Sequence, residues 1–356
     1  MNTKLLMKGN EALAEAAIRC GCKSYFGYPI TPQTEIAAYM AKRMPKAGGV
    51  YLQAESEISA INMVYGAAAA GIRSMTSSSS PGISLKTEGI SYLIGADLPC
   101  VIVNVMRGGP GLGGIQPSQS DYWQATRAPG HGDGHLLVLA PAGIQEMVDL
   151  TYLAFDLADE YRMPVMILAD GILGQMMEPV EFPQQEPKYV PKPWATNGHQ
   201  KNREHNIVNS LCLNPAELEQ SIQKRFLRYQ QIAQTQVRYQ AYDTEDAKIV
   251  VVAYGATARI ALAAVRQARK QGIEAGLIRP ITLWPFPKEV LLQLAKQVES
   301  FLCVEMSMGQ MLEDVQLAVN GRCPIYFFGH TGGVVPTPDE IVREILQISG
   351  GKNDDL

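Results

Sequence analysis

Residues 100–114 read CVIVNVMRGGPGLGG. Residues 100–106 form an apolar run that suits a strand buried on both faces, as in a parallel sheet. Strand-like and helix-like segments alternate on both sides of this run. Other strands of the first half are expected over 23–28, 50–54, 73–76, 136–139 and 165–168. The alternation predicts an α/β domain with a mostly parallel sheet.

The glycines after the run formally match the dinucleotide-binding spacing G-x-G-x-x-G at Gly109, Gly111 and Gly114. In that fingerprint a helix begins at the glycines and an acid ends the next strand. Here Gly114 is followed by Ile-Gln-Pro, and Asp133 precedes the next strand. The spacing is therefore interpreted as a coincidence of glycine density.

Arg107 stands at the carboxyl end of the expected strand, where open α/β sheets bind their ligands. A guanidinium suits a carboxylate or a phosphate, and bare glycine backbone allows a ligand to approach closely. The alternative is a structural arginine that pairs with a carboxylate or caps a helix carbonyl. The residues alone leave both interpretations open.

The second half of the chain begins with a change of character. Residues 183–246 combine a proline-rich, extended connector with a polar helix expected from 215 to about 240. Alternation then resumes, which predicts a smaller α/β domain over 247–356, after a first domain over 1–182.

Composition restricts the possible functions. The chain has 356 residues, 46% of them hydrophobic, and a formal net charge of −4. Nothing in this charge balance suggests binding to nucleic acid or to a membrane surface. The sequence has no bilayer-spanning apolar run and no signal-peptide pattern, so a cytoplasmic location is expected. Its six cysteines contain no C-x-x-C pair, which argues against an iron–sulfur or zinc site on this chain alone.

Five stretches resemble one enzyme family, in family order. They are GYPITPQTE (27–35), QAESEISAINMVYGAAAAG (53–71), SSSSPGISLKTEGISY (77–92), NVMRGGPGLGG (104–114) and RPITLWPFP (279–287). Together they resemble the alpha subunit of thiamine-dependent 2-oxoacid:ferredoxin oxidoreductases. The resemblance is greatest to the 2-oxoisovalerate (3-methyl-2-oxobutanoate) enzyme and covers nearly the whole chain.

The resemblance implies a fold and three site residues. The first domain would be of the pyrimidine-binding thiamine type, and the second would be transketolase-C-like. Glu57 matches the catalytic, cofactor-binding glutamate, Thr31 the substrate threonine and Arg107 the substrate-carboxylate arginine. A carboxylate bonded to the aminopyrimidine of thiamine diphosphate favours the tautomer that deprotonates C2.

Each of these residues also has a structural interpretation. Glu57 could be an ordinary helix-dipole partner in a first turn, and Glu55 is close enough to compete for the cofactor role. Thr31 and Pro32 could be the N-cap and first residue of a helix. The run from Ser77 to Ser80 could line the pocket, although a turn is the simpler interpretation.

The metal half of the expected site is missing. The family holds the diphosphate through Mg²⁺ bound by a G-D-G motif and a later asparagine. The chain has one G-D-G, at residues 132–134, but it precedes a strand and the next asparagine is Asn197. We therefore expect no metal ligand here, and Mg²⁺ and iron–sulfur clusters in partner subunits. The expected partners are a thiamine-diphosphate-binding beta subunit, gamma and ferredoxin-like iron–sulfur subunits, ferredoxin and CoA.

The expected activity is oxidative decarboxylation of a 2-oxo acid to acyl-CoA and CO₂ with reduction of ferredoxin, the thiamine diphosphate being shared with a partner. Three alternatives stay open. The substrate could be 2-oxoglutarate, the chain could be half of a non-redox transketolase or synthase, or it could be a noncatalytic scaffold subunit.

Overall fold

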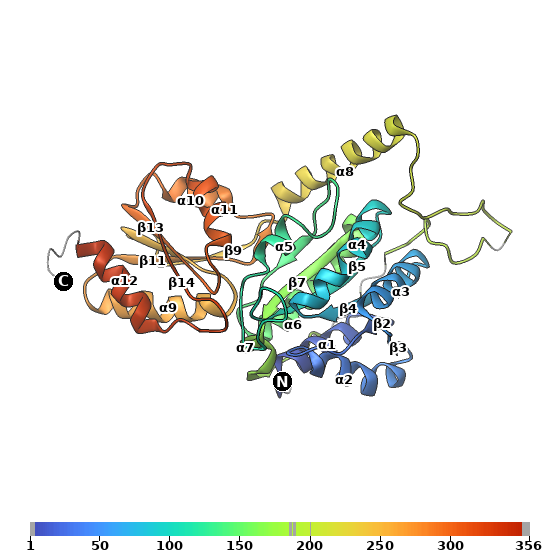
Figure 1. The fold of residues 1–356 in the computed structure, drawn as a ribbon, viewed down its shortest axis with the longest axis horizontal. Helices are drawn as coiled ribbons and strands as arrows, with labels where there is room; N and C mark the ends of the chain where they lie inside the picture. Colours follow the sequence, from blue (N-terminus) through green and yellow to red (C-terminus); the bar gives the residue numbers. More distant parts are fainter. Residues whose placement is uncertain (1–3, 185–186, 188–189, 200, 351–356) are drawn as a thin grey trace.

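The computed structural model describes residues 4–184, 187, 190–199 and 201–350. In this part of the chain two sheets, of seven and five strands, lie side by side, and each is flanked by helices (Figure 1). A two-stranded antiparallel ribbon, β1 (Leu5–Lys8) with β8 (Met177–Val180), was not predicted. The three ranges expected from the sequence each include positions outside the described residues. No helix in the described part is both long and apolar enough to cross a membrane.

The first sheet has the strand order β12-β6-β7-β5-β4-β2-β3. Six strands are parallel, and these are β2 (Ser24–Gly27), β3 (Val50–Gln53), β4 (Ser74–Ser78), β5 (Cys100–Met106), β6 (Leu137–Leu139) and β7 (Pro164–Asp170). Every residue of β5 is buried. Its side chains alternate between two cores, Ile102 on one face and Val101 and Val103 on the other, which confirms a strand buried on both sides.

The serine run is strand and helix, so its interpretation as a turn was wrong. Ser77 and Ser78 end β4, and Ser80 begins the next helix. The strand tolerates the buried Ser77 hydroxyl because neighbours bond it: Ser77 Oγ lies 2.6 Å from the Tyr25 hydroxyl and 2.5 Å from Gln33 Oε1.

Helices cover both faces of the first sheet (Figure 1). They are α1 (Gly9–Arg19), α2 (Thr34–Arg43), α3 (Glu57–Ala69), α4 (Ser80–Gly95), α5 (Tyr122–Thr126), α6 (Ile144–Tyr161) and α7 (Gly171–Gln175), with a short 3₁₀ turn at Pro45–Ala47. Hydrophobic side chains of α3 and α4 pack in one core, and those of α2 pack in the other. Those of α1 and α6 are divided between this second core and a small separate cluster.

The polar helix of the connector, α8 (Pro215–Thr235), ends before the expected residue 240. Residues beyond it form β9 (Tyr239–Tyr242), which pairs antiparallel with a strand of the second sheet. The periodicity of a local segment cannot predict that it will pair with a strand distant in sequence. Arg225 attaches α8 to the first domain through an ion pair of 3.1 Å with Asp97.

The second sheet has the order β14-β13-β10-β11-β9 and is parallel except for β9. Its other strands are β10 (Ile249–Val252), β11 (Ala275–Pro280), β13 (Ser300–Glu305) and β14 (Ile325–Gly329). Its helices are α9 (Gly255–Lys270), α10 (Lys288–Leu294), α11 (Gln310–Val319) and α12 (Pro338–Gly350). A second, smaller α/β unit is therefore present.

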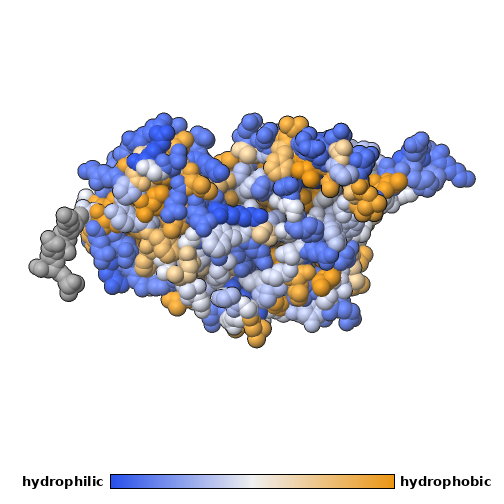
Figure 2. All heavy atoms as spheres, turned by 45° about the horizontal axis from the view of Figure 1, so that its top comes forward, coloured by the Kyte–Doolittle hydropathy of each residue, from blue (hydrophilic) through white to orange (hydrophobic). Residues whose placement is uncertain are grey.

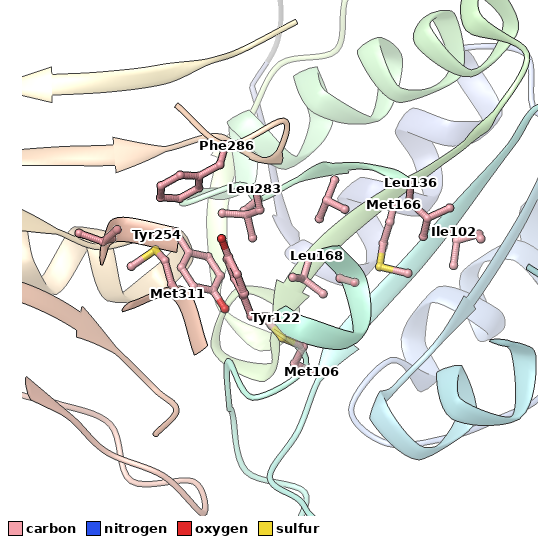
Figure 3. Close-up of a cluster of buried hydrophobic side chains, with 14 of the residues drawn as sticks. Ile102, Met106, Tyr122, Leu136, Met166, Leu168, Tyr254, Leu283, Phe286 and Met311 are labelled. Atoms are coloured by element: carbon pink, nitrogen blue, oxygen red, sulfur yellow. The ribbon is translucent and has the colours of Figure 1, made fainter. Parts of the chain in front are cut away.

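The two units share one apolar core. Tyr122 and Met106 come from the first unit, and Tyr254 and Met311 come from the second (Figure 3). The tyrosine rings tilt toward each other with centroids 5.8 Å apart. The segment between β11 and α10 also reaches across, because β12 (Thr282–Trp284) pairs antiparallel with β6.

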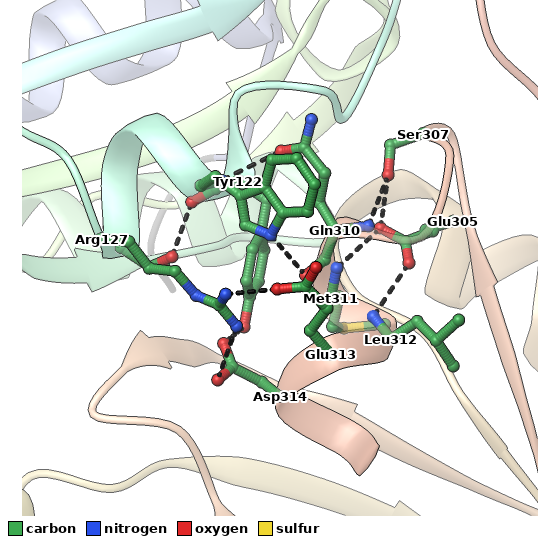
Figure 4. Close-up of polar contacts among 11 residues, drawn as sticks. Tyr122, Arg127, Glu305, Ser307, Gln310, Met311, Leu312, Glu313 and Asp314 are labelled. Carbon is green, nitrogen blue, oxygen red and sulfur yellow. Dashed lines mark hydrogen bonds and ion pairs between the residues drawn. The ribbon is translucent and has the colours of Figure 1, made fainter. Parts of the chain in front are cut away.

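Polar contacts reinforce this joint. Tyr122 donates a hydrogen bond of 2.6 Å to Asp314, and Arg127 pairs with Glu313 and Asp314 (Figure 4). Gln119 is buried between the units: its Nε2 donates to the Tyr254 carbonyl at 2.9 Å, and its Oε1 accepts from Met306 N at 2.9 Å. Hydrogen bonds and ion pairs thus connect the two units around their shared apolar core.

Candidate active site

The three predicted site residues follow the carboxyl ends of parallel strands of the first sheet. Thr31 follows β2, Glu57 follows β3 and Arg107 follows β5. Thr31 and Arg107 are in contact, because Arg107 Nη1 donates a hydrogen bond of 3.1 Å to the Thr31 carbonyl. Parallel strands bring their ends to one edge of the sheet, so residues far apart in the sequence meet there.

Arg107 is a buried cation without a carboxylate partner among the described residues. Its side chain bonds only the carbonyls of Thr31 and Leu112, both at 3.1 Å and both in turns, and Nε has no hydrogen-bond partner. Among the described residues, Arg107 therefore neither forms an ion pair nor caps a helix carbonyl. Its role at the site stays a prediction, and a guanidinium suits an anionic ligand.

A polar network behind Arg107 fixes its backbone. Arg107 N donates to Ser80 Oγ at 3.0 Å, and Ser80 Oγ in turn donates to Asp121 at 2.6 Å. Asn104 also donates to Asp121, at 2.9 Å. Burial raises the pKa of Asp121. Sequence reasoning missed this network, although an asparagine within an apolar strand was a signal for it.

Thr31 does not cap a helix. Helix α2 begins at Thr34 with Gln33 as the N-cap, so the expected pair of N-cap and first-turn proline was wrong. Asn10 and Gln175 donate to the Pro32 carbonyl at 2.8 and 3.2 Å, and these bonds hold the segment outside the helix.

Thr31 is exposed at the edge of a cavity of about 560 Å³. The other lining residues are Pro32, Glu35, Ile115, Gln116, Pro117, Gly171, Ile172, Gln175, Gly333 and Val335. A larger cavity of about 820 Å³ includes Gly21 and Gly71, which precede the amino ends of β2 and β4. That larger cavity is therefore at the edge of the sheet away from the predicted site residues.

Glu57 is the first residue of α3 and is 6% exposed, whereas Glu55 is exposed. A Cβ atom at Gly82 would lie 2.7 Å from Glu57 Oε1 and 2.1 Å from Ser78 Oγ, so a glycine is what lets the carboxylate approach α4. Within the described chain the carboxylate has no hydrogen bond or ion pair. A carboxylate that served only the helix dipole would need no such burial. Burial favours Glu57 over Glu55 as the functional acid.

The G-D-G sequence at residues 132–134 lies in a loop before β6, and Asp133 is exposed. The structure brings none of the three predicted site residues to it. In the described part of the chain no group of three or more His, Cys, Asp or Glu side chains is placed to hold a metal ion.

Two family models match the chain. Residues 15–254 match the thiamine-diphosphate-binding region of pyruvate flavodoxin/ferredoxin oxidoreductases, and residues 247–341 match core domain II of pyruvate:ferredoxin oxidoreductase. The ketoisovalerate oxidoreductase subunit VorB of Methanothermobacter marburgensis is 49% identical, over 98% of this chain and 99% of the relative. The chain is a subunit of the 2-oxoacid:ferredoxin oxidoreductase family.

Other relatives agree with this membership. The 2-oxoglutarate synthase subunit KorA of Methanothermobacter thermautotrophicus is 36% identical over 98% of this subunit and 100% of the relative. The solved 2-oxoglutarate:ferredoxin oxidoreductase from Magnetococcus marinus superposes with a TM-score of 0.87 and 27% identity, over 97% of the subunit and 65% of that longer chain. A split-gene transketolase with a TM-score of 0.57 and 13% identity shares the fold alone. The predicted fold class and enzyme family are confirmed.

The residues at the sheet edge fit part of a thiamine diphosphate. The Glu57 carboxylate is buried and unbonded within the described chain, as a partner for a pyrimidine nitrogen must be. Buried polar atoms without hydrogen-bond partners occur on β4, on α4 and just after β5, namely Thr76 Oγ1, Ser78 Oγ, Lys86 Nζ and Arg107 Nε. The Glu57 carboxylate thus fits the pyrimidine ring of the cofactor.

Proposed function

We propose that this subunit supplies the pyrimidine side of a thiamine diphosphate site and the carboxylate-binding arginine for a 2-oxo acid. The enzyme would oxidatively decarboxylate 2-oxoisovalerate and related branched-chain 2-oxo acids to acyl-CoA and CO₂, with reduction of ferredoxin. The observation that carries the proposal is the buried Arg107 guanidinium, which bonds only backbone carbonyls beside Thr31. A scaffold subunit would have no use for such an uncompensated charge.

In this proposal each residue has one task. Bound thiamine diphosphate would supply the nucleophilic carbon that adds to the 2-oxo carbonyl. Glu57 would hold and exchange a proton with the pyrimidine ring, since its carboxylate is buried and unbonded within the described chain. Arg107 would bind the substrate carboxylate, and Thr31 would orient it from the neighbouring turn.

The cavity beside Thr31 supports a branched-chain substrate over 2-oxoglutarate. Its lining includes Ile115, Ile172 and Val335, and its charged member is Glu35. A second substrate carboxylate placed there would face the Glu35 carboxylate, which already pairs with Lys8 at 3.6 Å, and none of the described lining residues is a cation. The greater identity to the ketoisovalerate subunits, 49% against 36% for KorA, supports the same choice.

A partner surface is also part of the proposal. Apolar side chains are solvent-exposed along α3, which begins at Glu57, and along α4, namely Ile58, Met63, Leu85 and Tyr92. Figure 2 shows apolar patches on the surface of the molecule. A beta subunit seated on these helices would bring the Mg²⁺ and diphosphate half of the site to Glu57. Gamma and ferredoxin-like iron–sulfur subunits would carry electrons to ferredoxin.

We also retain the ranges 1–182, 183–246 and 247–356 as the pyrimidine-binding-type domain, the connector with its helix, and the transketolase-C-like domain. A cytoplasmic location is part of the proposal, and the six free cysteines support it.

The test uses the subunit alone and the complex purified with its native partners. Dye reduction is measured with CoA and a panel of 2-oxo acids. We expect turnover by the complex only, with the highest kcat/KM for 2-oxoisovalerate. Highest kcat/KM for 2-oxoglutarate would establish the alternative substrate. A complex with normal turnover after Arg107→Ala and Glu57→Gln would show that the subunit is a scaffold.

A further inference from the structure

Lys86 is a fully buried lysine in the middle of α4. Within the described chain its Nζ has neither a hydrogen-bond partner nor an ion pair. Burial lowers the pKa of Lys86 to about 8, and the nearby Glu57 carboxylate opposes this effect. An unpaired buried charge is costly, so its position calls for a functional explanation.

The packing of α4 on α3 places Lys86 beside Glu57. Gly82, Lys86 and Gly89 follow one another at four- and three-residue spacing, so they share one face of α4. This face contacts α3 at both ends: a Cβ at Gly82 would meet Glu57 Oε1 at 2.7 Å, and a Cβ at Gly89 would meet Ile61 Cγ2 at 2.4 Å. Lys86 lies between these two contacts.

The direction of the side chain points to the same neighbour. Helical side chains lean toward the amino terminus of their helix, so the Lys86 stem runs from its own turn toward Gly82 and the Glu57 carboxylate. Glu57 is also the charged group of the described chain that acts on the pKa of Lys86. The positive end of the α4 dipole lies in that direction and repels a cation. Attraction to the Glu57 carboxylate therefore offsets the electrostatic cost of placing the Lys86 ammonium at this position.

We propose that Lys86 is a positioning residue for Glu57. By charge attraction its ammonium holds the Glu57 side chain against the first turn of α4, in the orientation that lets the carboxylate meet the pyrimidine ring. This inference rests on the proposed function, because Glu57 must face the cofactor for Lys86 to act through it.

The first experiment tests the pair in the full chain without cofactor. Lysine labelled with ¹³C at Cε is titrated by NMR, and the Lys86 resonance is identified by its absence in Lys86→Met. We expect Glu57→Gln to lower the titration midpoint of Lys86, since it removes the charge that stabilises the ammonium. The control, Glu55→Gln, should leave the midpoint in place. An unchanged midpoint in Glu57→Gln would overturn the proposal, even if Lys86→Met failed to assemble.

The second experiment measures C2 proton exchange of bound thiamine diphosphate in the assembled enzyme. We expect Lys86→Met to slow exchange about tenfold, and to add little in a Glu57→Gln background, because it acts through that residue. Ile90→Met, a buried swap one turn further along α4, should leave exchange unchanged. Additive effects of the two substitutions, or wild-type exchange in Lys86→Met, would contradict the inference.

The same data separate the two proposals. If Glu57→Gln slows exchange and Lys86→Met does not, the role of Lys86 alone is refuted. If Glu57→Gln itself exchanges at the wild-type rate, the cofactor role of Glu57 fails, and the inference about Lys86 fails with it.

Discussion

Two buried arginines of this subunit differ in what they bind. Arg225 pairs with Asp97 at 3.1 Å, whereas Arg107 bonds two backbone carbonyls. We expect Arg107→Lys to lower kcat/KM for the 2-oxo acid, with a loss of transition-state stabilisation of roughly 2–4 kcal/mol. Lysine keeps the positive charge but loses the two-pronged geometry of the guanidinium. Steady-state kinetics on the assembled enzyme measures this. In the control, Arg225→Lys, the melting temperature should fall while the kinetics stay normal. If Arg107→Lys instead lowered the melting temperature and left kcat/KM normal, Arg107 would be a structural residue.

Glu57 and Glu55 form a second matched pair at the residue scale, because one is buried and the other is exposed. Glu57→Gln should slow C2 proton exchange by about 10²- to 10⁴-fold, the range for loss of a positioned proton-transfer group. The exchange is followed by NMR of the bound cofactor after deuterium quench. Glu55→Gln should exchange at the wild-type rate. If instead Glu55→Gln is the slow variant, the cofactor contact belongs to Glu55.

At the scale of elements, the contact between α3 and α4 depends on two glycines. Alanine at Gly82 would intrude on Glu57 Oε1 and Ser78 Oγ, and alanine at Gly89 would intrude on Ile61. Both substitutions overpack the helix pair, which costs about 1–3 kcal/mol of unfolding free energy. We expect Gly82→Ala alone also to raise the Kd for thiamine diphosphate in the complex, by about tenfold, because it displaces the carboxylate. Calorimetric titration measures the Kd for the cofactor in the two variants, and denaturant unfolding measures their stability. Equal Kd values for Gly82→Ala and Gly89→Ala would show that Gly82 has no special role in admitting Glu57.

At the scale of the whole molecule, Asp170 connects the two units. It ends β7 and accepts hydrogen bonds from Ile172 N at 2.9 Å and Leu173 N at 3.2 Å, and from the amide of Ala256 in α9. Burial raises the pKa of Asp170 to about 6. An unfolded aspartate titrates near 3.9, so the folded state binds this proton more tightly. Its contribution to stability is thus present below about pH 4 and is lost as pH rises through 6.

Asp170→Asn removes this titration while keeping an acceptor for the amides. We expect the unfolding free energy of wild type, relative to Asp170→Asn, to decline between pH 4 and 6. Urea unfolding at several pH values provides the measurement, and Asp133→Asn, on an exposed loop, is the control. A constant difference between wild type and Asp170→Asn across this range would disprove the assignment.

The sequence by itself determined the α/β class, the apolar central strand and the position of Glu57, Thr31 and Arg107 after strands of one sheet. These follow from local periodicity, because the burial pattern of a strand or helix is written in neighbouring residues. The motifs around the same residues also indicated the enzyme family.

Only the tertiary structure decided which distant groups meet. It showed that Arg107 has no described carboxylate partner, that Gly82 admits Glu57, and that Lys86 lies between α3 and α4. It also placed Thr282–Trp284 in the first sheet and Tyr239–Tyr242 at the edge of the second. Such contacts depend on how completed elements pack, and spacing along the chain carries no information on which side chains then face one another.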